Sequence, residues 1–118
     1  MTIGAAIGIS GNPFLYAQQT PKPISDSKDI AGKWYGTVVA RGYSVAITLI
    51  FKEDGTYEVI SRYTGVTGGT IKVSDGKAHF KNNRGETGTF TLYEDKTGPI
   101  LRSERDDGTA SGEYTPVK

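Results

Sequence analysis

Residues 43–51 hold the feature that most constrains the fold, a run of large apolar side chains at every second position. These are Tyr43, Val45, Ile47, Leu49 and Phe51. Aromatic and β-branched residues repeating with a period of two predict a β-strand that buries one face. The run therefore predicts a sheet whose inner face lines an enclosed interior.

The same period recurs along the rest of the chain, and tight turns separate the segments. Dipeptides that end in glycine, such as Asp54-Gly55 and Asp75-Gly76, are typical of hairpin turns. No helical pattern follows residue 32, and strands joined by short turns must be antiparallel. The expected strands cover residues 33–40, 43–51, 56–63, 69–74, 77–81, 87–93, 99–104 and 110–116.

Eight short strands in sequence predict an all-β protein, an antiparallel up-and-down barrel that leaves no exposed sheet edge. A two-sheet sandwich is the alternative architecture, but it usually needs a long crossover connection. No such connection is found in the sequence. We expect the barrel domain to cover residues 30–118.

The first 17 residues form an apolar segment of small side chains that a polar stretch follows. This pattern indicates a signal peptide, which predicts a secreted or periplasmic protein, although no basic residue precedes Lys22. The alternative is a retained apolar arm that adds to a neighbour's sheet and supports a homo-oligomer. Residues 18–29, with two prolines, are expected to be a linker, and Asp29–Ala31 a single helical turn.

The composition argues against several classes of partner. The 14 Lys and Arg residues nearly balance the 13 Asp and Glu residues, and they form no basic stripe. This balance gives no support for binding to nucleic acid or for electrostatic docking to membranes. The apolar N-terminal segment is too short for a transmembrane helix. The lack of cysteine excludes disulfides and thiolate metal sites.

The stretch Gly32-Lys33-Trp34-Tyr35 contains the only tryptophan and opens the first expected strand. It resembles the G-x-W-Y motif at the start of lipocalins and the wider calycin group. That resemblance covers about residues 30–118 and implies a barrel whose narrow end is closed by Trp34. It also implies an arginine from late in the barrel, Arg102 or Arg105, packed over the tryptophan ring.

The chain departs from lipocalins proper, which are nearly twice as long and carry a helix after the barrel. It departs from avidins too, which place several tryptophans around their ligand. The turn-rich segment 107–113 is similar to the end of compact lipocalin-like domains of exported bacterial proteins. The resemblance is therefore to this compact group.

Few residues suggest catalysis or metal binding. His79, the only histidine, is expected on an outer face between Lys77 and Lys81, with no second imidazole or thiolate as partner. The acidic pairs at 53–54, 94–95 and 106–107 fall in turns, where aspartate before glycine needs no metal to explain it. We therefore expect neither an enzyme nor a metal or cofactor site.

Aromatic side chains on the expected inner face are the one group that suggests binding. Together with serine hydroxyls they would give an apolar cup a few polar groups, as in many small-molecule sites. An eight-stranded barrel is just wide enough either to be filled by its own side chains or to hold one small ligand. The expected ligand-binding residues are Trp34, Tyr43, Phe51, Tyr57, Tyr63, Phe80, Phe90 and Tyr114.

Two functional hypotheses follow. In the first, the protein binds a small apolar or amphipathic ligand inside the barrel, and a glycine-rich loop at 64–69 gates the mouth. In the second, the barrel is filled, and the protein is a structural or interaction module. It would then act through its N-terminal arm or through outward apolar residues, namely Tyr35, Val39, Ile50, Ile60 and Tyr93.

Overall fold

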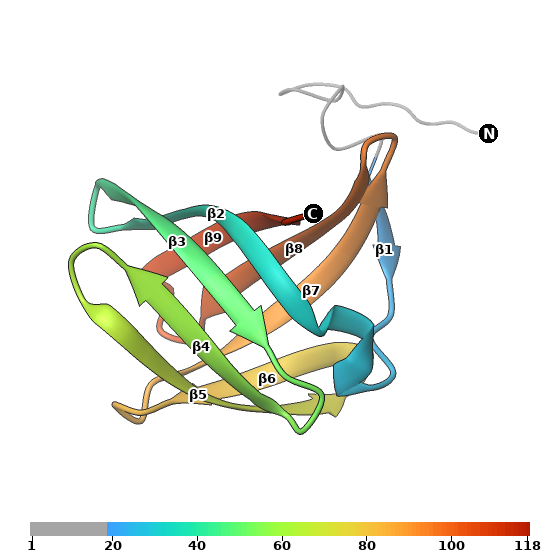
Figure 1. Cartoon of the computed structure of the whole chain (residues 1–118), viewed down its shortest axis with the longest axis horizontal. Helices are drawn as coiled ribbons and strands as arrows, with labels where there is room; N and C mark the ends of the chain where they lie inside the picture. The colour runs from blue at the N-terminus through green and yellow to red at the C-terminus, as the bar shows by residue number, and fades with distance from the viewer. Residues whose placement is uncertain (1–18) are drawn as a thin grey trace.

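A computed structural model of the chain describes residues 19–118, so the expectations for residues 1–17 lie outside the described part. The described chain is almost entirely β-structure (Figure 1). In chain order its elements are β1 (Thr20–Lys22), η2 (Ser27–Ile30), β2 (Gly32–Ala40), β3 (Tyr43–Phe51), β4 (Thr56–Ser61), β5 (Gly65–Ser74), β6 (Lys77–Asn82), β7 (Thr87–Asp95), β8 (Gly98–Arg105) and β9 (Ala110–Pro116).

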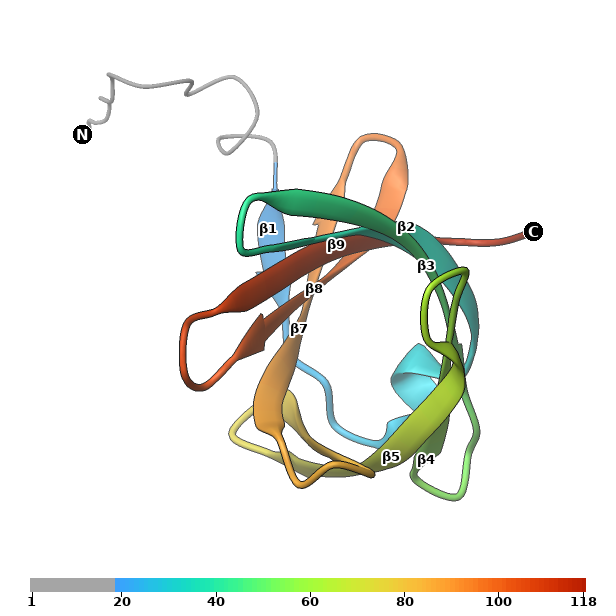
Figure 2. The ribbon, with the colours of Figure 1, turned by 90° about the vertical axis from the view of Figure 1, so that its left-hand side faces the viewer.

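Strands β2 to β9 form a closed antiparallel barrel. Each strand pairs with the next along the chain, and β9 closes the ring by pairing with β2 from Trp34↔Pro116 to Ala40↔Ala110. Figure 2 shows the ring of strands around a central axis. The predicted eight-stranded up-and-down barrel is confirmed. Each connection between β2 and β9 is a hairpin, and the first strand, β2, pairs with the last, β9.

The predicted alternation places one face of each strand in the interior. In β3, Leu49 and Phe51 are buried, and Ile47 is packed against the same core. Neighbouring strands supply Tyr57, Ile71, Phe80, Phe90, Leu92, Leu101 and Tyr114 to this core. Burial of these side chains is the main stabilising contribution to the barrel.

The two ends of the barrel differ in how they are covered. At one end, the closed end, residues 23–30 cross the barrel beneath the turns at 52–55 and 75–76. Ile24 N donates to Gly76 O (2.8 Å), and Ser27 Oγ donates to Glu53 O (2.7 Å). At the other end, the open end, lie the connections at 41–42, 62–64, 83–86 and 106–109, on the left of Figure 1.

The described part of the expected linker, residues 19–29, is built into the fold. Strand β1 pairs with the part of β7 beyond its pairing with β6, from Thr20↔Glu94 to Lys22↔Leu92. The helical turn begins at Ser27, two residues before the expected start, because Asp26 rather than Asp29 caps it. Asp29 instead completes a capping box by accepting from the Asp26 backbone N–H.

Trp34 lies at the closed end, next to η2. Its indole Nε1 donates to Ile30 O (2.9 Å), and only 4% of the residue is exposed. Ile24 and Ile30 complete the same end of the core. A large ring anchored by its polar atom therefore fills the closed end of the barrel, where the resemblance placed Trp34.

The glycine-rich stretch at 64–69 is a strand from Gly65 onward, so the prediction of a gating loop is wrong. Gly68 pairs with Glu58 of β4, and Gly69 pairs with both Tyr57 of β4 and Asn82 of β6. A side chain at Gly69 would collide with the Lys81 carbonyl on the adjacent strand. The glycines here permit close backbone approach instead of mobility.

Candidate functional site

The open end of the barrel contains a cavity of about 420 Å³. It lies between the aromatic core and the four hairpin connections of the mouth. Its apolar wall is formed by side chains that the alternation directs inward: Val38 and Ala40 of β2, Ile47 of β3, Val59 of β4 and Ala110 of β9. The barrel is thus filled at one end and hollow at the other.

Four aromatic rings separate the cavity from the closed end. Phe90 lies at their centre, with its ring centroid 5.0 Å from those of Phe51 and Phe80 and 5.8 Å from that of Tyr57. The contacts with Phe51 and Tyr57 are edge-to-face, an arrangement that aromatic quadrupoles favour. The floor of the cavity is formed by Tyr57, Phe80 and Phe90.

Two tyrosine hydroxyls add polar groups to this floor. Tyr114 Oη is 2.8 Å from Ser103 Oγ, and burial raises the pKa of Tyr114 to about 12. Burial likewise raises the pKa of Tyr57, and the charges of the nearby Tyr114 and Glu86 raise it further. Both groups are neutral at pH 7, and no hydrogen bond is formed by Tyr57 Oη within residues 19–118. A ligand in the cavity would therefore meet a free hydroxyl.

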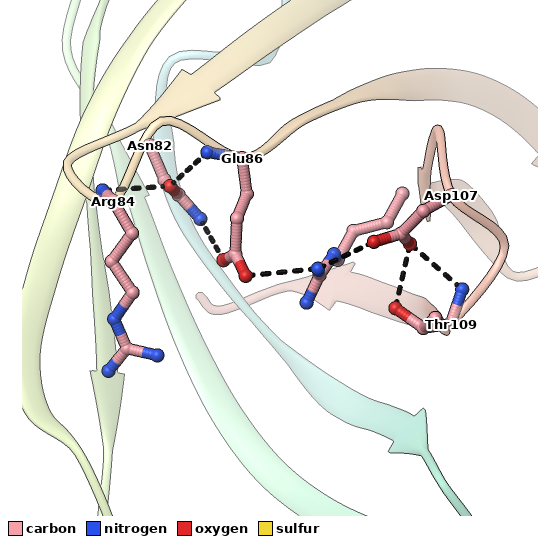
Figure 3. Close-up of polar contacts among 6 residues, drawn as sticks. Asn82, Arg84, Glu86, Asp107 and Thr109 are labelled. Atoms are coloured by element: carbon pink, nitrogen blue, oxygen red, sulfur yellow. Dashed lines mark hydrogen bonds and ion pairs between the residues drawn. The ribbon is translucent and has the colours of Figure 1, made fainter.

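One side of the mouth is held by a polar network (Figure 3). The Asn82 side chain accepts from the backbone N–H groups of Arg84 (3.0 Å) and Glu86 (2.9 Å), and its amide donates to Glu86 Oε1 (2.8 Å). Glu86 pairs in turn with Arg105 (2.9 Å), which also pairs with Asp107 (2.8 Å). The network joins the β6–β7 connection to the β8–β9 connection.

Arg105 Nε is buried and has no hydrogen-bond acceptor among the described residues, and Arg105 lines the cavity. A buried donor without an acceptor costs free energy. An oxygen atom of a bound molecule would relieve that cost. The mouth thus combines an apolar wall with a donor that has no acceptor within residues 19–118.

The expected site residues fall into three groups. Tyr57, Phe80, Phe90 and Tyr114 line the cavity, and Phe51 and Trp34 lie beneath it in the core. The structure does not bring Tyr43 and Tyr63 to this site. It brings the other six together in one core cluster.

The expectation that Tyr43 and Tyr63 face the interior is wrong, because they are 75% and 77% exposed. In the alternation of inward and outward side chains along each strand, both residues fall on inward positions; this property is called inward parity below. Tyr43, however, follows the turn at 41–42 directly, and Tyr63 lies in the connection after β4 ends at Ser61. At these positions the strands have passed beyond the closed ring, so no opposite wall covers the rings.

Neither late arginine acts as the resemblance implies. Arg102 lies on the outer face of the barrel, where its Cζ is 4.6 Å from the Tyr93 ring centroid and its guanidinium donates to Gln19. Arg105 forms its ion pairs at the mouth, at the opposite end from Trp34. Residues 23–30 cover the closed end instead.

Several cavity residues were not predicted as site residues. Val38, Ile47 and Val59 have an inward parity but no aromatic ring, and the prediction of site residues used only the aromatic residues. Asn82 and Glu86 flank a tight turn, a spacing that could have indicated a side-chain contact across it. Arg105 has the same parity as Leu101 and Ser103, which was the available signal for its inward position.

No family model, curated protein or solved structure matches the chain. The architecture is consistent with a lipocalin-like barrel. Within residues 19–118 there is no group of three or more side chains suited to hold a metal ion, and His79 is exposed on the outer face of β6. None of the helices in the described part has the length and apolarity to cross a membrane.

Proposed function

We propose that this protein binds one small apolar or amphipathic molecule in the open end of its barrel and performs no chemistry on it. The observation that carries the proposal is the cavity of about 420 Å³ above an aromatic floor. Ligand sites are typically concave and mostly apolar, with a few placed polar groups. The Tyr57 hydroxyl and Arg105 Nε would supply those groups here.

The ligand has an apolar body and one oxygen acceptor. The wall offers aliphatic side chains from β2, β3 and β4, which favour an apolar body. The donors lie on two sides of the cavity, Tyr57 on β4 and Arg105 at the end of β8. An acceptor on the ligand would satisfy at least one of them without disturbing the ion pairs of Arg105.

A non-enzymatic role fits the chemistry of the lining. Its carboxylate, Glu86, is already held by Asn82 and Arg105. The tyrosine hydroxyls are neutral at pH 7, and burial raises the pKa of each further above its ordinary value. Such groups can position a ligand, but they form no pair of nucleophile and base.

We also propose that the protein is an exported member of the compact lipocalin-like group. Support for this comes from the G-x-W-Y stretch at the start of the barrel and from the apolar sequence at 1–17. Mass spectrometry of the protein secreted by its host tests this part: a mature chain that begins near residue 18 is the expected result, and a cytoplasmic chain that retains Met1 contradicts it.

Ligand binding is tested by titrating the purified protein with the neutral fluorescent probe 6-propionyl-2-(dimethylamino)naphthalene, whose carbonyl oxygen is an acceptor on an apolar body. We expect saturable binding of one molecule per chain. Val38→Phe would fill the cavity and weaken the binding at least roughly tenfold. The matched control is Thr37→Phe, at an exposed position on the outer face of the same strand, which should change nothing. Absence of saturable binding, or equal effects of the two variants, would disprove the proposal.

A further inference from the structure

Exposed apolar side chains gather on two of the hairpins at the open end. Seven large apolar residues of the described chain are exposed, and two of them, Tyr35 and Val117, lie elsewhere. The other five are on the β2–β3 and β4–β5 hairpins: Val39 (49%), Tyr43 (75%), Ile60 (38%), Tyr63 (77%) and Val66 (64%). Such clustering is unlike the single scattered apolar residues of an ordinary surface.

The two hairpins are neighbours in the barrel. Strand β3 of the first pairs with β4 of the second, and the pairing ends at Ile47↔Ser61. Residues 43–46 of β3 and the connection at 62–64 lie beyond that pair, and both hairpins lie at the open end (Figure 1). Within the second hairpin, Ile60 lies directly opposite Val66. The five exposed residues therefore lie on adjacent hairpins along one side of the cavity's opening. Together with the arginines of the same hairpins they are called the fringe.

Each hairpin also carries an exposed arginine, Arg41 on the first and Arg62 on the second. Within residues 19–118 neither forms an ion pair, whereas Arg102 and Arg105 are both paired with carboxylates. No acidic residue occurs from residue 30 to 52 or from 59 to 74. The fringe thus bears two uncompensated positive charges, although the whole chain is nearly neutral.

We propose that this fringe, defined as Val39, Arg41, Tyr43, Ile60, Arg62, Tyr63 and Val66, docks the open end of the barrel onto an anionic lipid surface. Tyrosine is enriched at the interface between lipid and water, where its ring and hydroxyl are both accommodated. Arginine adds attraction to acidic headgroups. Docked in this way, the cavity opens onto the lipid. The docking does not depend on whether the cavity holds a ligand.

A fluid lipid surface suits this fringe better than a protein partner does. A stable protein interface uses about 20–30 residues on each side, whereas the fringe offers seven, most of them close to two narrow tips. Headgroups can adapt around protruding tips. The binding is weak and reversible, because few apolar groups enter the interface and each arginine contributes only about 1 kcal/mol near the surface.

Flotation of the full chain with lipid vesicles tests the docking. We expect binding to vesicles of equimolar phosphatidylglycerol and phosphatidylcholine, and little binding to phosphatidylcholine alone. Arg41→Gln with Arg62→Gln should weaken the binding at least roughly tenfold, since about 1 kcal/mol per arginine is about fivefold. Lys72→Gln with Lys77→Gln removes the same charge from exposed positions outside the fringe and should have little effect.

Loss of the two tyrosines, by Tyr43→Ser with Tyr63→Ser, should weaken the binding by a similar factor. If the apolar segment at 1–17 carried the binding instead, the fringe variants would float like the wild type, and the proposal would be overturned. Equal effects of the arginine and lysine pairs would overturn it as well. Binding of an acidic protein together with a failure to float would show that the fringe is a protein interface, and the lipid proposal would be wrong.

Site-specific labelling gives the orientation, because the chain contains no cysteine and a single introduced thiol is unique. An environment-sensitive fluorophore at Tyr63→Cys should shift its emission to shorter wavelength on anionic vesicles. The same label at Lys28→Cys, in η2 at the closed end, should not shift. A shift at both positions, or only at the closed end, contradicts docking through the open end.

Discussion

The two ends of the barrel follow one sequence pattern and reach opposite outcomes. At the closed end, Trp34 has an inward parity and is 4% exposed. At the open end, Tyr43 and Tyr63 have the same inward parity and are at least 75% exposed. The difference comes from residues 23–30, which cross the closed end, whereas no described segment crosses the mouth (Figure 2).

This comparison shows that parity determines which face a side chain occupies, while burial depends on what lies opposite. Trp34 is covered because η2 presents the Ile30 carbonyl to its indole. Tyr43 has only Ala40 directly across the hairpin and solvent beyond it. The closed end is thus packed, whereas the open end keeps a cavity and exposed side chains.

The largest difference between the ends is expected when Trp34→Ala at the closed end is compared with Tyr63→Ala at the open end. Removal of a buried tryptophan ring should lower the free energy of unfolding by about 3–5 kcal/mol, since it creates a cavity beneath η2. Tyr63→Ala at the open end should change it by no more than about 0.5 kcal/mol, because an exposed ring loses little. Urea unfolding followed by far-ultraviolet circular dichroism measures both. Similar values for the two variants would show that the ends do not differ as described.

A matched pair of isoleucines compares the ends with identical chemistry. Ile30→Ala should destabilise by about 2–5 kcal/mol, because Ile30 is fully buried among well-packed neighbours. Ile47→Ala should cost about 1 kcal/mol, since Ile47 is half-buried and already borders the cavity. The measurement is the midpoint of denaturant unfolding for each variant, compared at an unchanged dependence of the unfolding free energy on denaturant concentration. If Ile47→Ala cost as much as Ile30→Ala, the open end would be filled.

Alkaline unfolding tests whether water is excluded from the tyrosine hydroxyls of the cavity floor. The pKa of Tyr114 is about 12 in the folded protein and about 10 in the unfolded chain, so the folded state retains its proton over that range. Stability from this group is complete below pH 10 and declines as the pH rises toward 12, by about 2–3 kcal/mol. Tyr57 acts in the same direction.

Unfolding free energies measured from pH 9 to 12 check this expectation. Replacing both residues, by Tyr57→Phe with Tyr114→Phe, should flatten the decline even if it lowers stability at neutral pH. A double variant with the wild-type slope would mean that water reaches these hydroxyls in the folded protein.

The smallest expected difference concerns two turn aspartates. Hydrogen bonds from Thr56 lower the pKa of Asp54 at the closed end, and those from Thr109, assisted by Arg105, lower that of Asp107 at the open end. Stability from a lowered pKa is present above the unfolded value and is lost as the pH falls through the folded value.

Asp54→Asn and Asp107→Asn should therefore each reduce the loss of stability below pH 4. The effect should be greater for Asp107→Asn, because that change also removes the ion pair with Arg105. Thermal unfolding at pH 3 and pH 7 is the measurement. A greater effect at Asp54 would show that the polar network at the mouth contributes less than the turn itself.

Most of the barrel could be predicted from local pattern. Six of the eight aromatic residues expected at the site lie in the core or line the cavity, because their strands run within the closed ring. The strand after Thr64 was missed at its start. Glycines signal turns in a sequence, and only the pairing of Gly68 and Gly69 with the neighbouring strands shows that they lie in a sheet.

The rest of the site depended on contacts between distant segments. Arg105 reaches Glu86 across 19 positions of the chain, and no local pattern indicates that pair. The positive fringe could not be predicted from the near-neutral composition either. It exists because Arg41 and Arg62 lie on neighbouring hairpins at the mouth, where neither forms an ion pair within residues 19–118.

The sequence by itself determined that the chain forms antiparallel strands and which side of each strand faces inward, because a period of two is a local property of the extended backbone. The tertiary structure alone decided where the interior is filled, where it is hollow and which charges are left unpaired. These depend on closure of the ring and on the crossing of residues 23–30 over one end, which bring together residues far apart in the chain.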